Sequence, residues 1–352
     1  MKKPLIPHSR PTIGKEEIDA VSQVIASGQI AQGQAVAAFE EAFARKMGVR
    51  YAAAVSSGTA ALHLALLALG VTPGMEVIIP SFVCTALLNV VNYTGATPVL
   101  ADINPVTLNI DPSDVAGKVT ASTGAIIVPH MFGLMADLAE LRKFGVPLIE
   151  DCAQAVGADW DGKKAGSFGK IGIYSFYATK VMTCGEGGMV VSNENKLIDW
   201  IKQAREYDNV DAYALRYNYK MTDIQAAMGR QQLGRLNNLV ARRREIAGQY
   251  RDAFDKLPFS MPPDSSSHIY YRFNLNVGKN VGRWIAQMEA AGVACARPVF
   301  KPLHLYLEGC RCTQADNAYE QMLSIPIYPH LSDGDVNKIV RAVTRISTKL
   351  NT

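Results

Sequence analysis

From Val55 to Ser192, short runs of apolar residues alternate with stretches of helical spacing. Most of the short runs are continuously apolar, which is typical of strands buried on both faces of a parallel sheet. The runs that we expect to form strands are residues 76–80, 97–102, 125–130, 146–151, 171–176 and 189–192. This alternation predicts an α/β fold with a mostly parallel central sheet flanked by helices.

The regions on either side follow other patterns. Residues 14–47 predict two helices around the loop 27–33, and a long helical stretch runs from Thr222 to Leu257, where Pro258 stops it. Segment 261–267, rich in Pro and Ser, is the best linker candidate. The elements expected beyond it are strands at 270–277, near 293 and at 324–328, and helices at 281–291 and from 332 onwards. We therefore expect a large domain, residues 1–240 with the N-terminal helices, and a smaller C-terminal α+β domain, residues 241–352.

Composition and charge exclude several classes of protein. The 352 residues are 48% hydrophobic and 19% charged, and 36 basic against 32 acidic residues leave a net charge of only +4. The one basic cluster, residues 242–244, falls in a predicted helix and is best explained as a solvated face. The longest apolar run, residues 60–70, is too short to span a bilayer. We expect neither nucleic acid nor a membrane as a partner.

Cysteines and histidines show no spacing typical of a metal site. The six cysteines form no Cys-x-x-Cys pair, and the six histidines are scattered without a His-Glu-x-x-His motif. The first twelve residues lack the apolar core of a secretory signal. The sequence therefore predicts reduced thiols, a cytoplasmic protein and no metal.

Polar residues gather where the predicted strands end. They are Ser81, Asp102, His130, the pair Glu150 and Asp151, and Ser175. A single Asp at a strand end is often only a turn residue. Several polar residues on one edge favour a site, because ligands of parallel α/β sheets bind beyond the carboxyl ends of the strands.

The first motif at this edge is Ser-Ser-Gly-Thr, residues 56–59, followed by an apolar helical stretch. Gly58 and Thr59 would open that helix, whose N-terminal N–H groups suit a phosphate. Taken alone, the motif is explained better by an ordinary helix cap from Ser57 or Thr59.

The second motif is Glu-Asp-Cys-Ala-Gln, residues 150–154. Asp151 and Gln154 can face one ligand if the chain turns helical after the strand. A carboxylate beside a ring nitrogen keeps that nitrogen protonated, and an amide can donate to a ring oxygen.

The third motif, residues 175–180, ends a strand and places Lys180 in an apolar stretch, with a glycine-rich segment at 185–188. Lysines that bind an aldehyde covalently need such surroundings, although a surface lysine would also fit the pattern. Together the three motifs supply a phosphate seat, an Asp for a pyridine nitrogen and a Lys for an aldehyde. These are the groups that pyridoxal 5'-phosphate (PLP) requires.

At this point the sequence resembles the DegT/DnrJ/EryC1/StrS family of fold-type I PLP enzymes, which aminate nucleotide-linked keto sugars. The resemblance runs from about Ile6 to the C-terminal helix and rests on blocks in family order and spacing. The blocks are Ser-Gly-Thr, Glu-Asp-x-Ala-Gln, Ser-Phe-x-x-Thr-Lys and Gly-Glu-Gly-Gly, together with residues 217–227 and 324–329. It implies the PLP-transferase fold of type I, with residues 1–240 as the PLP-binding domain.

The resemblance also implies roles for individual residues. Lys180 would bind the cofactor covalently and move the proton, Asp151 would pair with the pyridine nitrogen, and Gln154 would reach the ring hydroxyl oxygen. The phosphate would be held by Gly58, Thr59 and Ser175. Asn218 would reach the phosphate of a neighbouring subunit's cofactor, which implies a homodimer with shared active sites. His304 matches a position near the sugar nucleotide.

Two positions depart from the family pattern. Cys84 stands where the family usually stacks an aromatic residue on the cofactor ring, so a softer sulfur contact would replace the stacking. Lys220 stands where the family commonly has Arg, so a bidentate contact to substrate would become a point charge.

The resemblance implies an aminotransferase that uses glutamate as donor and a nucleotide-linked keto sugar as acceptor. Family members that instead act as dehydratases or deoxygenases typically lack the lysine, so Lys180 favours amino transfer. A non-catalytic regulator that binds PLP or a sugar stays open as an alternative. A nicotinamide oxidoreductase is unfavoured, because Gly166, Gly169 and Gly172 precede a strand and do not form the dinucleotide fingerprint.

Overall fold

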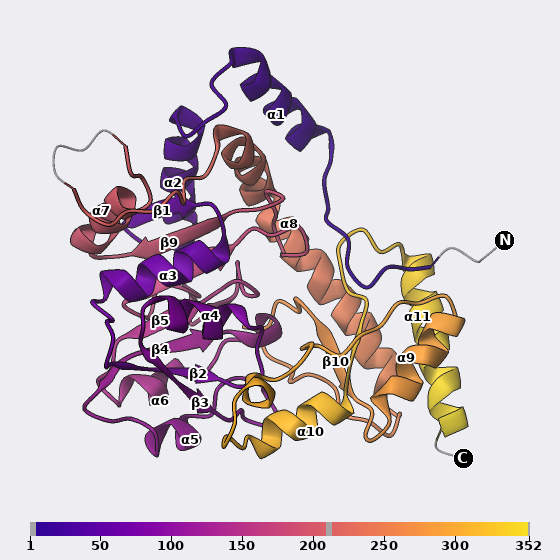
Figure 1. The fold of residues 1–352 in the computed structure, drawn as a ribbon. Coiled ribbons are helices and arrows are strands. Elements are labelled where there is room, and N and C mark those ends of the chain that lie inside the picture. The colour runs from indigo at the N-terminus through magenta and orange to yellow at the C-terminus, as the bar shows by residue number, and fades with distance from the viewer. Residues whose placement is uncertain (1–4, 209–212, 351–352) are drawn as a thin grey trace.

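The computed structural model describes residues 5–208 and 213–350, and these form two lobes joined by one long helix (Figure 1). In this part of the chain the large lobe contains a seven-stranded sheet. In spatial order its strands are β1 (Tyr51–Val55), β9 (Gly188–Ser192), β8 (Ile171–Ser175), β5 (Leu148–Asp151), β4 (Thr123–Pro129), β2 (Glu76–Pro80) and β3 (Thr97–Ala101).

The five strands from β8 to β3 pair in parallel, while β9 runs antiparallel to both of its neighbours. The prediction of a mostly parallel α/β sheet is therefore confirmed, and six strands were predicted to within two residues of each end. Strand β1 was missed, because Ala52, Ala53 and Ala54 give it little β-branched character.

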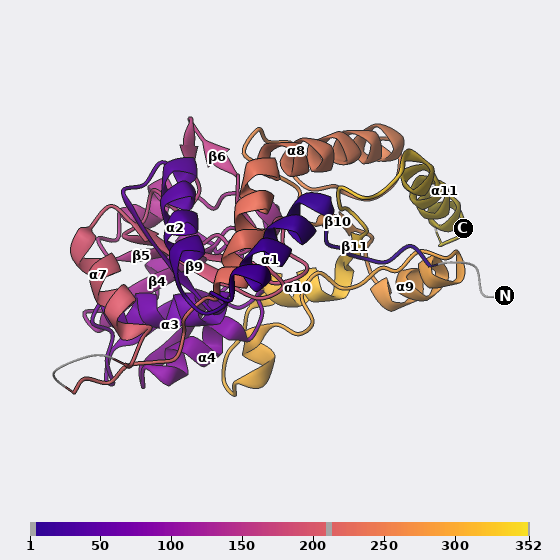
Figure 2. The same ribbon diagram turned by 90° about the horizontal axis from the view of Figure 1, so that it is seen from above.

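Helices cover both faces of the sheet (Figures 1 and 2). Helices α3 (Gly58–Ala68), α4 (Ala86–Tyr93) and α7 (Asn195–Ala204) pack on one face, and α2 (Gln34–Met47) with the first half of α8 (Asp223–Phe254) packs on the other. The alternation of β1 shows this division, because Ala53 faces the first group and Ala54 the second. Two short helices, α5 (Pro112–Ala116) and α6 (Leu138–Arg142), pack on the face opposite α3 and α4, over β2, β3, β4 and β5.

The N-terminal helices form as the sequence predicts, with α1 (Lys15–Ser27) ending at Gly28, whose φ is +76°. Helix α2 is capped from a distance, since the Asp223 carboxylate accepts the N–H groups of Gly33 (2.8 Å) and Val36 (2.9 Å). Helix α8 begins with a capping box, in which Thr222 and Gln225 each accept the other's backbone N–H. The Asp223 cap ties α2 to α8, and α1 is tied to α8 by the Glu17 carboxylate, which accepts from Gln232 and Arg235.

The small lobe has its own core around two antiparallel strands, β10 (Phe273–Asn276) and β11 (Met322–Ile325). Helices α9 (Val281–Ala290) and α11 (Asp333–Leu350) cover them, and α10 (Thr313–Gln321) lies towards the large lobe. The strand expected at 270–277 is therefore shorter, and the one expected at 324–328 begins and ends earlier in the chain. The strand expected near Val293 is a single bridge to Ile6. Helix α10 was not predicted.

The division between the lobes falls within a continuous helix. Residues of α8 up to Val240 pack into the core of the large lobe, and those from Ile246 pack into the small one. We therefore propose residue 240 as the boundary, with the qualification that Ile6 packs into the small lobe and Leu303 into the large one. Within the described residues, no helix combines the length and apolar character needed to cross a membrane.

Candidate functional site

The carboxyl ends of β1 and β8 meet at the N-terminus of α3. Ser57 caps this helix by accepting the Ala60 N–H (3.0 Å), while the N–H groups of Gly58 and Thr59 belong to the first turn, where a helix offers no acceptor. A Cβ added to Gly58 would lie 2.7 Å from the Cβ of Ser175, so only glycine allows this approach. The structure thus brings Gly58, Thr59 and Ser175 together, and the free N–H groups of a helix N-terminus are suited to an anion.

Asp151 ends β5 and is 7% exposed. Its Oδ1 accepts the Ala153 N–H at 2.9 Å. Burial raises the pKa of this carboxyl above its ordinary value, and the nearby positive charge of Lys180 opposes that shift. A buried carboxylate with so little compensation suits a cationic partner such as a protonated ring nitrogen.

Gln154 lies one short turn beyond Asp151. Its Oε1 accepts the N–H of Phe132 at 2.8 Å, which leaves the amide nitrogen as the group that can donate to a ligand. Phe132 itself has a φ of +58°, which is unusual for a residue other than glycine. The side chain of Gln154 therefore also holds a strained backbone segment beside the site.

Lys180 lies in the loop after β8, where its N–H donates to the Tyr177 carbonyl at 2.9 Å. Its Nζ lies 5.4 Å from the ring centre of Tyr271. The positive charge of Lys180 lies near enough to lower the pKa values of Asp151, Cys84 and Tyr271.

Cys84 follows β2 and is exposed, although protein atoms crowd around its thiol. This crowding raises the pKa of the thiol, as does the nearby Asp151, while Lys180 lowers it. The two aromatic residues considered as replacements for a stacking ring are Phe82, two residues before Cys84, and Tyr177, three residues before Lys180. Phe82 is fully buried and packs edge-on against Phe132, and Tyr177 is 47% exposed.

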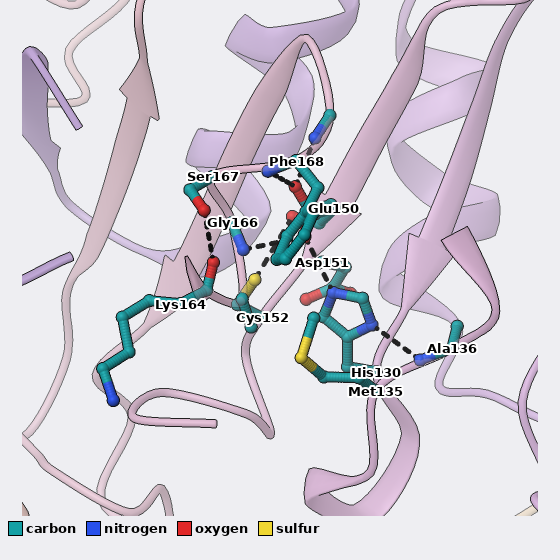
Figure 3. A network of polar contacts seen from close by, with 12 residues as sticks. His130, Met135, Ala136, Glu150, Asp151, Cys152, Lys164, Gly166, Ser167 and Phe168 are labelled. Atoms are coloured by element: carbon teal, nitrogen blue, oxygen red, sulfur yellow. Dashed lines mark hydrogen bonds and ion pairs between the residues drawn. The ribbon is translucent and has the colours of Figure 1, made fainter. Parts of the chain in front are cut away.

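The carboxylate of Glu150, next to Asp151, is fully hydrogen-bonded to groups of the protein (Figure 3). Glu150 accepts the N–H groups of Gly166 (2.8 Å), Phe168 (2.7 Å) and Gly169, and the Nε2–H of His130 (3.0 Å). The tautomer of His130 is set by its partners, because Nδ1 accepts the Ala136 N–H at 3.1 Å. Although His130, Glu150 and Cys152 offer ligand atoms within 4.8 Å of one another, these bonds use the histidine and the carboxylate.

Two other polar strand ends are structural. Asp102 caps α10 by accepting the N–H groups of Gln314 and Ala315. Ser81 binds His304, whose Nδ1 lies 2.6 Å from the Ser81 hydroxyl and whose Nε2 lies 2.9 Å from Asp316. A direct contact from His304 to a substrate would have to break one of these bonds, so that role stays a prediction.

Asn218 and Lys220 lie on an extended segment beside α7. Tyr217 and Tyr219 pack on His63, whereas Asn218 between them is exposed. Lys220 is half-buried, with its Nζ 3.5 Å from Glu206 and 5.2 Å from the ring centre of Tyr207. Their proposed contacts with a second subunit and with substrate remain predictions.

Tyr271 was missed by the reasoning from sequence. It directly precedes β10 of the small lobe, but its side chain packs into the core of the large lobe, next to Lys180 and Thr179. Nothing in the local pattern marks such a residue, because its place depends on how the lobes pack. The only feature of the sequence that could have drawn attention to it is its position just after the predicted linker, residues 261–267.

The chain is similar to known proteins over nearly its whole length. The model of the DegT/DnrJ/EryC1/StrS aminotransferase family matches residues 11–344. The chain is 37% identical to the spore coat polysaccharide biosynthesis protein SpsC of Bacillus subtilis, covering 97% of both chains. It is 32% identical to GDP-perosamine synthase of Caulobacter vibrioides, covering 97% of this chain and 98% of the relative. Spr1654 from Streptococcus pneumoniae, solved in its PLP form, superposes with a TM-score of 0.93 at 26% identity over 99% of this chain and 100% of the other.

Proposed function

Because the chain belongs to the DegT/DnrJ/EryC1/StrS aminotransferase family, we propose that it transfers an amino group from glutamate to a nucleotide-linked keto sugar, with PLP held by Lys180. The family and the relatives make it a sugar aminotransferase with the α/β fold of PLP-dependent aminotransferases. One relative is named for GDP-perosamine and another for polysaccharide synthesis, which supports a sugar nucleotide as acceptor. The single observation that supports the proposal is that the charge of Lys180 acts on the buried carboxyl of Asp151, on the sheet edge where Gly58 closely approaches Ser175.

The residues present fit PLP in three places. The phosphate would sit on the N–H groups of Gly58 and Thr59, in the space that the absence of a Gly58 side chain leaves beside Ser175. The pyridine nitrogen would compensate the buried charge of Asp151. The ring hydroxyl oxygen would accept from the amide nitrogen of Gln154, whose oxygen is already bonded to Phe132.

Each of these residues has a defined task in the reaction. When bound, the cofactor carries the amino group and takes up the electron pair released when the donor's α-carbon loses its proton. Asp151 keeps the ring nitrogen protonated, which favours that uptake. Lys180 would anchor the cofactor and, as a free amine, would take the proton from the donor's α-carbon and return it to the cofactor carbon on the far side of the transferred nitrogen. Removal of water from the buried edge strengthens the charge interactions.

We propose that the working form is a homodimer with shared active sites. Asn218 is exposed, and on the same segment Tyr213 is 95% and Leu215 70% exposed. Apolar side chains this exposed beside a polar one fit an interface with a second copy. The cytoplasm is the proposed location, because all six cysteines are free thiols and the acceptor is a nucleotide sugar.

The test begins with the lysine link. Purified protein is mixed with PLP and treated with borohydride, and the modified peptide is identified by mass spectrometry. We expect the label on Lys180, an absorbance band that glutamate bleaches, and in Lys180→Ala the loss of both with turnover lower by several orders of magnitude. The matched control is Lys170→Ala, at the other end of β8, where the lysine pairs with Glu194.

Two results would contradict the proposal. A label on another lysine would remove Lys180 as the anchor. If the wild-type protein is folded but carries no label, the assignment of PLP as its cofactor is wrong. After a positive result, keto sugars linked to different nucleotides are tested as acceptors, and the formation of 2-oxoglutarate and of an amino sugar nucleotide is measured together.

A further inference from the structure

Tyr271 joins the small lobe to the loop that carries Lys180. The residue is 6% exposed and stands directly before β10. Its ring faces the Nζ of Lys180 at 5.4 Å from the ring centre, within the range of a cation–π contact. Its hydroxyl lies 3.4 Å from the Thr179 hydroxyl. One side chain therefore contacts the lysine and the residue that precedes it.

The backbone of Tyr271 is fixed on two sides. Its carbonyl accepts from Arg243 of α8 at 3.2 Å, and Arg243 is 2% exposed. On the other side Gly133 lies so close that an added Cβ would be 3.0 Å from the Tyr271 nitrogen and 3.3 Å from the Gln154 carbonyl oxygen. The backbone of Tyr271 is therefore held in a fixed position next to the segment that carries Gln154.

Positive charges surround the phenol. The guanidinium carbons of Arg272 and Arg243 lie 5.0 Å and 5.9 Å from the ring centre, in addition to Lys180. Burial disfavours the phenolate, but Lys180 and Arg272, with help from Thr179 and Arg243, lower the pKa of Tyr271 to about 8.

The lysine has a different set of neighbours on its other side. Asp151 and Cys84 both interact with Lys180 electrostatically. Asp151 is the group that would face the ring nitrogen, so its charge would interact with the cofactor rather than with Lys180. Tyr271 is therefore the neighbour that stays available to the lysine when the cofactor is in place.

We propose that Tyr271 is a positioning residue for Lys180: its ring face holds the lysine nitrogen in the protonated state that follows when it takes the donor's proton, and its hydroxyl ties the lysine's loop to the segment that leads into the small lobe. This role rests on the proposed function of Lys180. A displaced lysine would otherwise swing freely on four methylene groups, and each productive return would cost side-chain entropy.

The first test uses the protein without PLP, so it does not depend on turnover. An amine-reactive acylating reagent is added at a series of pH values, and the labelling rate of Lys180 is followed by peptide mass spectrometry. In Tyr271→Phe, which keeps the ring, we expect wild-type labelling well below pH 8. Well above pH 8, labelling should be faster than in wild type, because the phenolate that stabilises the ammonium of Lys180 is missing. In Tyr271→Leu, labelling should be faster at every pH, by up to about tenfold, since the cation–π contact is lost.

The matched controls are Tyr270→Phe and Tyr270→Leu. Tyr270 is equally buried, but its ring stacks on His268 and its hydroxyl lies near Asp264. Labelling of Lys180 in these variants should follow wild type. Thermal unfolding of all variants shows which of them fold, and if Tyr271→Leu does not, the alkaline part of the Tyr271→Phe profile decides alone.

The second test measures turnover of the loaded enzyme. We expect a lower kcat in both Tyr271 variants, larger in Tyr271→Leu, with KM for donor and acceptor little changed. The proposal is overturned if the Lys180 labelling profiles of the Tyr271 variants coincide with wild type, or if the Tyr270 variants shift them equally. A failure of the proposed function appears separately, as wild-type protein in which borohydride attaches no cofactor to Lys180.

Discussion

Strand β5 ends in two adjacent carboxylates that point to opposite faces of the sheet and differ in almost every contact. Glu150 is fully buried and accepts four N–H groups, three from the backbone of residues 166–169 and one from His130. Asp151 is almost as buried but accepts a single backbone N–H, from Ala153. A buried carboxylate that the protein satisfies completely belongs to the architecture. One left nearly without donors is built for a ligand.

The pKa values of the two groups separate in the same sense. Burial disfavours both charges, but the hydrogen bond from His130, together with the N–H groups of Gly169 and Gly166, lowers the pKa of Glu150 below its ordinary value. Burial is the largest influence on Asp151, and the Ala153 N–H and Lys180 do not outweigh it, so its pKa is raised. Environment thus gives neighbouring acids opposite properties, as is common at functional sites.

The largest effect that the comparison predicts is on turnover in Asp151→Asn. The amide oxygen can keep the bond from Ala153, so the fold should be retained, but the ring nitrogen loses its anion. We expect kcat to fall about a thousandfold, at the upper end of the loss caused by removing one preorganised electrostatic partner. Steady-state kinetics with glutamate measures this, and urea unfolding checks that stability is at least that of wild type.

A loss of stability in Asp151→Asn with turnover intact would reverse the assignment of the two carboxylates. The control is the equivalent change in the neighbour, Glu150→Gln, which removes the same charge one residue away.

The next effect is on the stability of Glu150→Gln. The amide keeps one oxygen and turns an NH₂ group towards donors, so two of the four N–H groups lose their acceptor. We expect a loss of about 2 kcal/mol in the free energy of unfolding, since each buried donor left unpaired costs about 1 kcal/mol or more. Urea unfolding of the cofactor-free protein is the measurement, and wild-type stability would show that Glu150 is not a structural hub.

The residues grouped around Asp151 could be predicted from sequence, because their proximity follows from the strand pattern and from the topology of a parallel sheet. The carboxyl ends of parallel strands share one edge, so Asp151, Ser175 and Lys180 had to lie near one another once the apolar runs were recognised as strands. The helix N-terminus at Gly58 joined them through β9, the antiparallel strand between β1 and β8.

The remainder depends on packing between segments far apart in sequence. Asp102 and Ser81 had the same strand-end signature as Asp151, yet they serve α10 and His304, neither of which a local pattern could place beside them. Tyr271 reaches Lys180 only because the two lobes pack together. Pattern therefore predicts which edge carries the site, and tertiary contact decides which polar residues on that edge remain available.

The smallest and most specific effect is on the pH dependence of stability, where the two carboxylates should differ in sign. The pKa of Asp151 in the folded protein lies above the usual 3.8, so its neutral form favours folding and its charged form opposes it at neutral pH. Asp151→Asn should therefore gain stability relative to wild type near pH 7, and this gain should shrink as the pH falls and Asp151 becomes protonated. The pKa of Glu150 lies below the usual 4.5, so its stabilisation is complete above that pH and disappears only as the pH falls through the lowered value.

The deficit of Glu150→Gln should accordingly stay constant from pH 7 down to 4.5 and shrink only below it. Urea unfolding of the three cofactor-free proteins at matched pH values measures both differences. Parallel curves for the two variants would mean that the environments on the two sides of β5 are electrostatically alike. The surroundings of Asp151 would then give no reason to expect a positively charged ring beside it rather than beside Glu150.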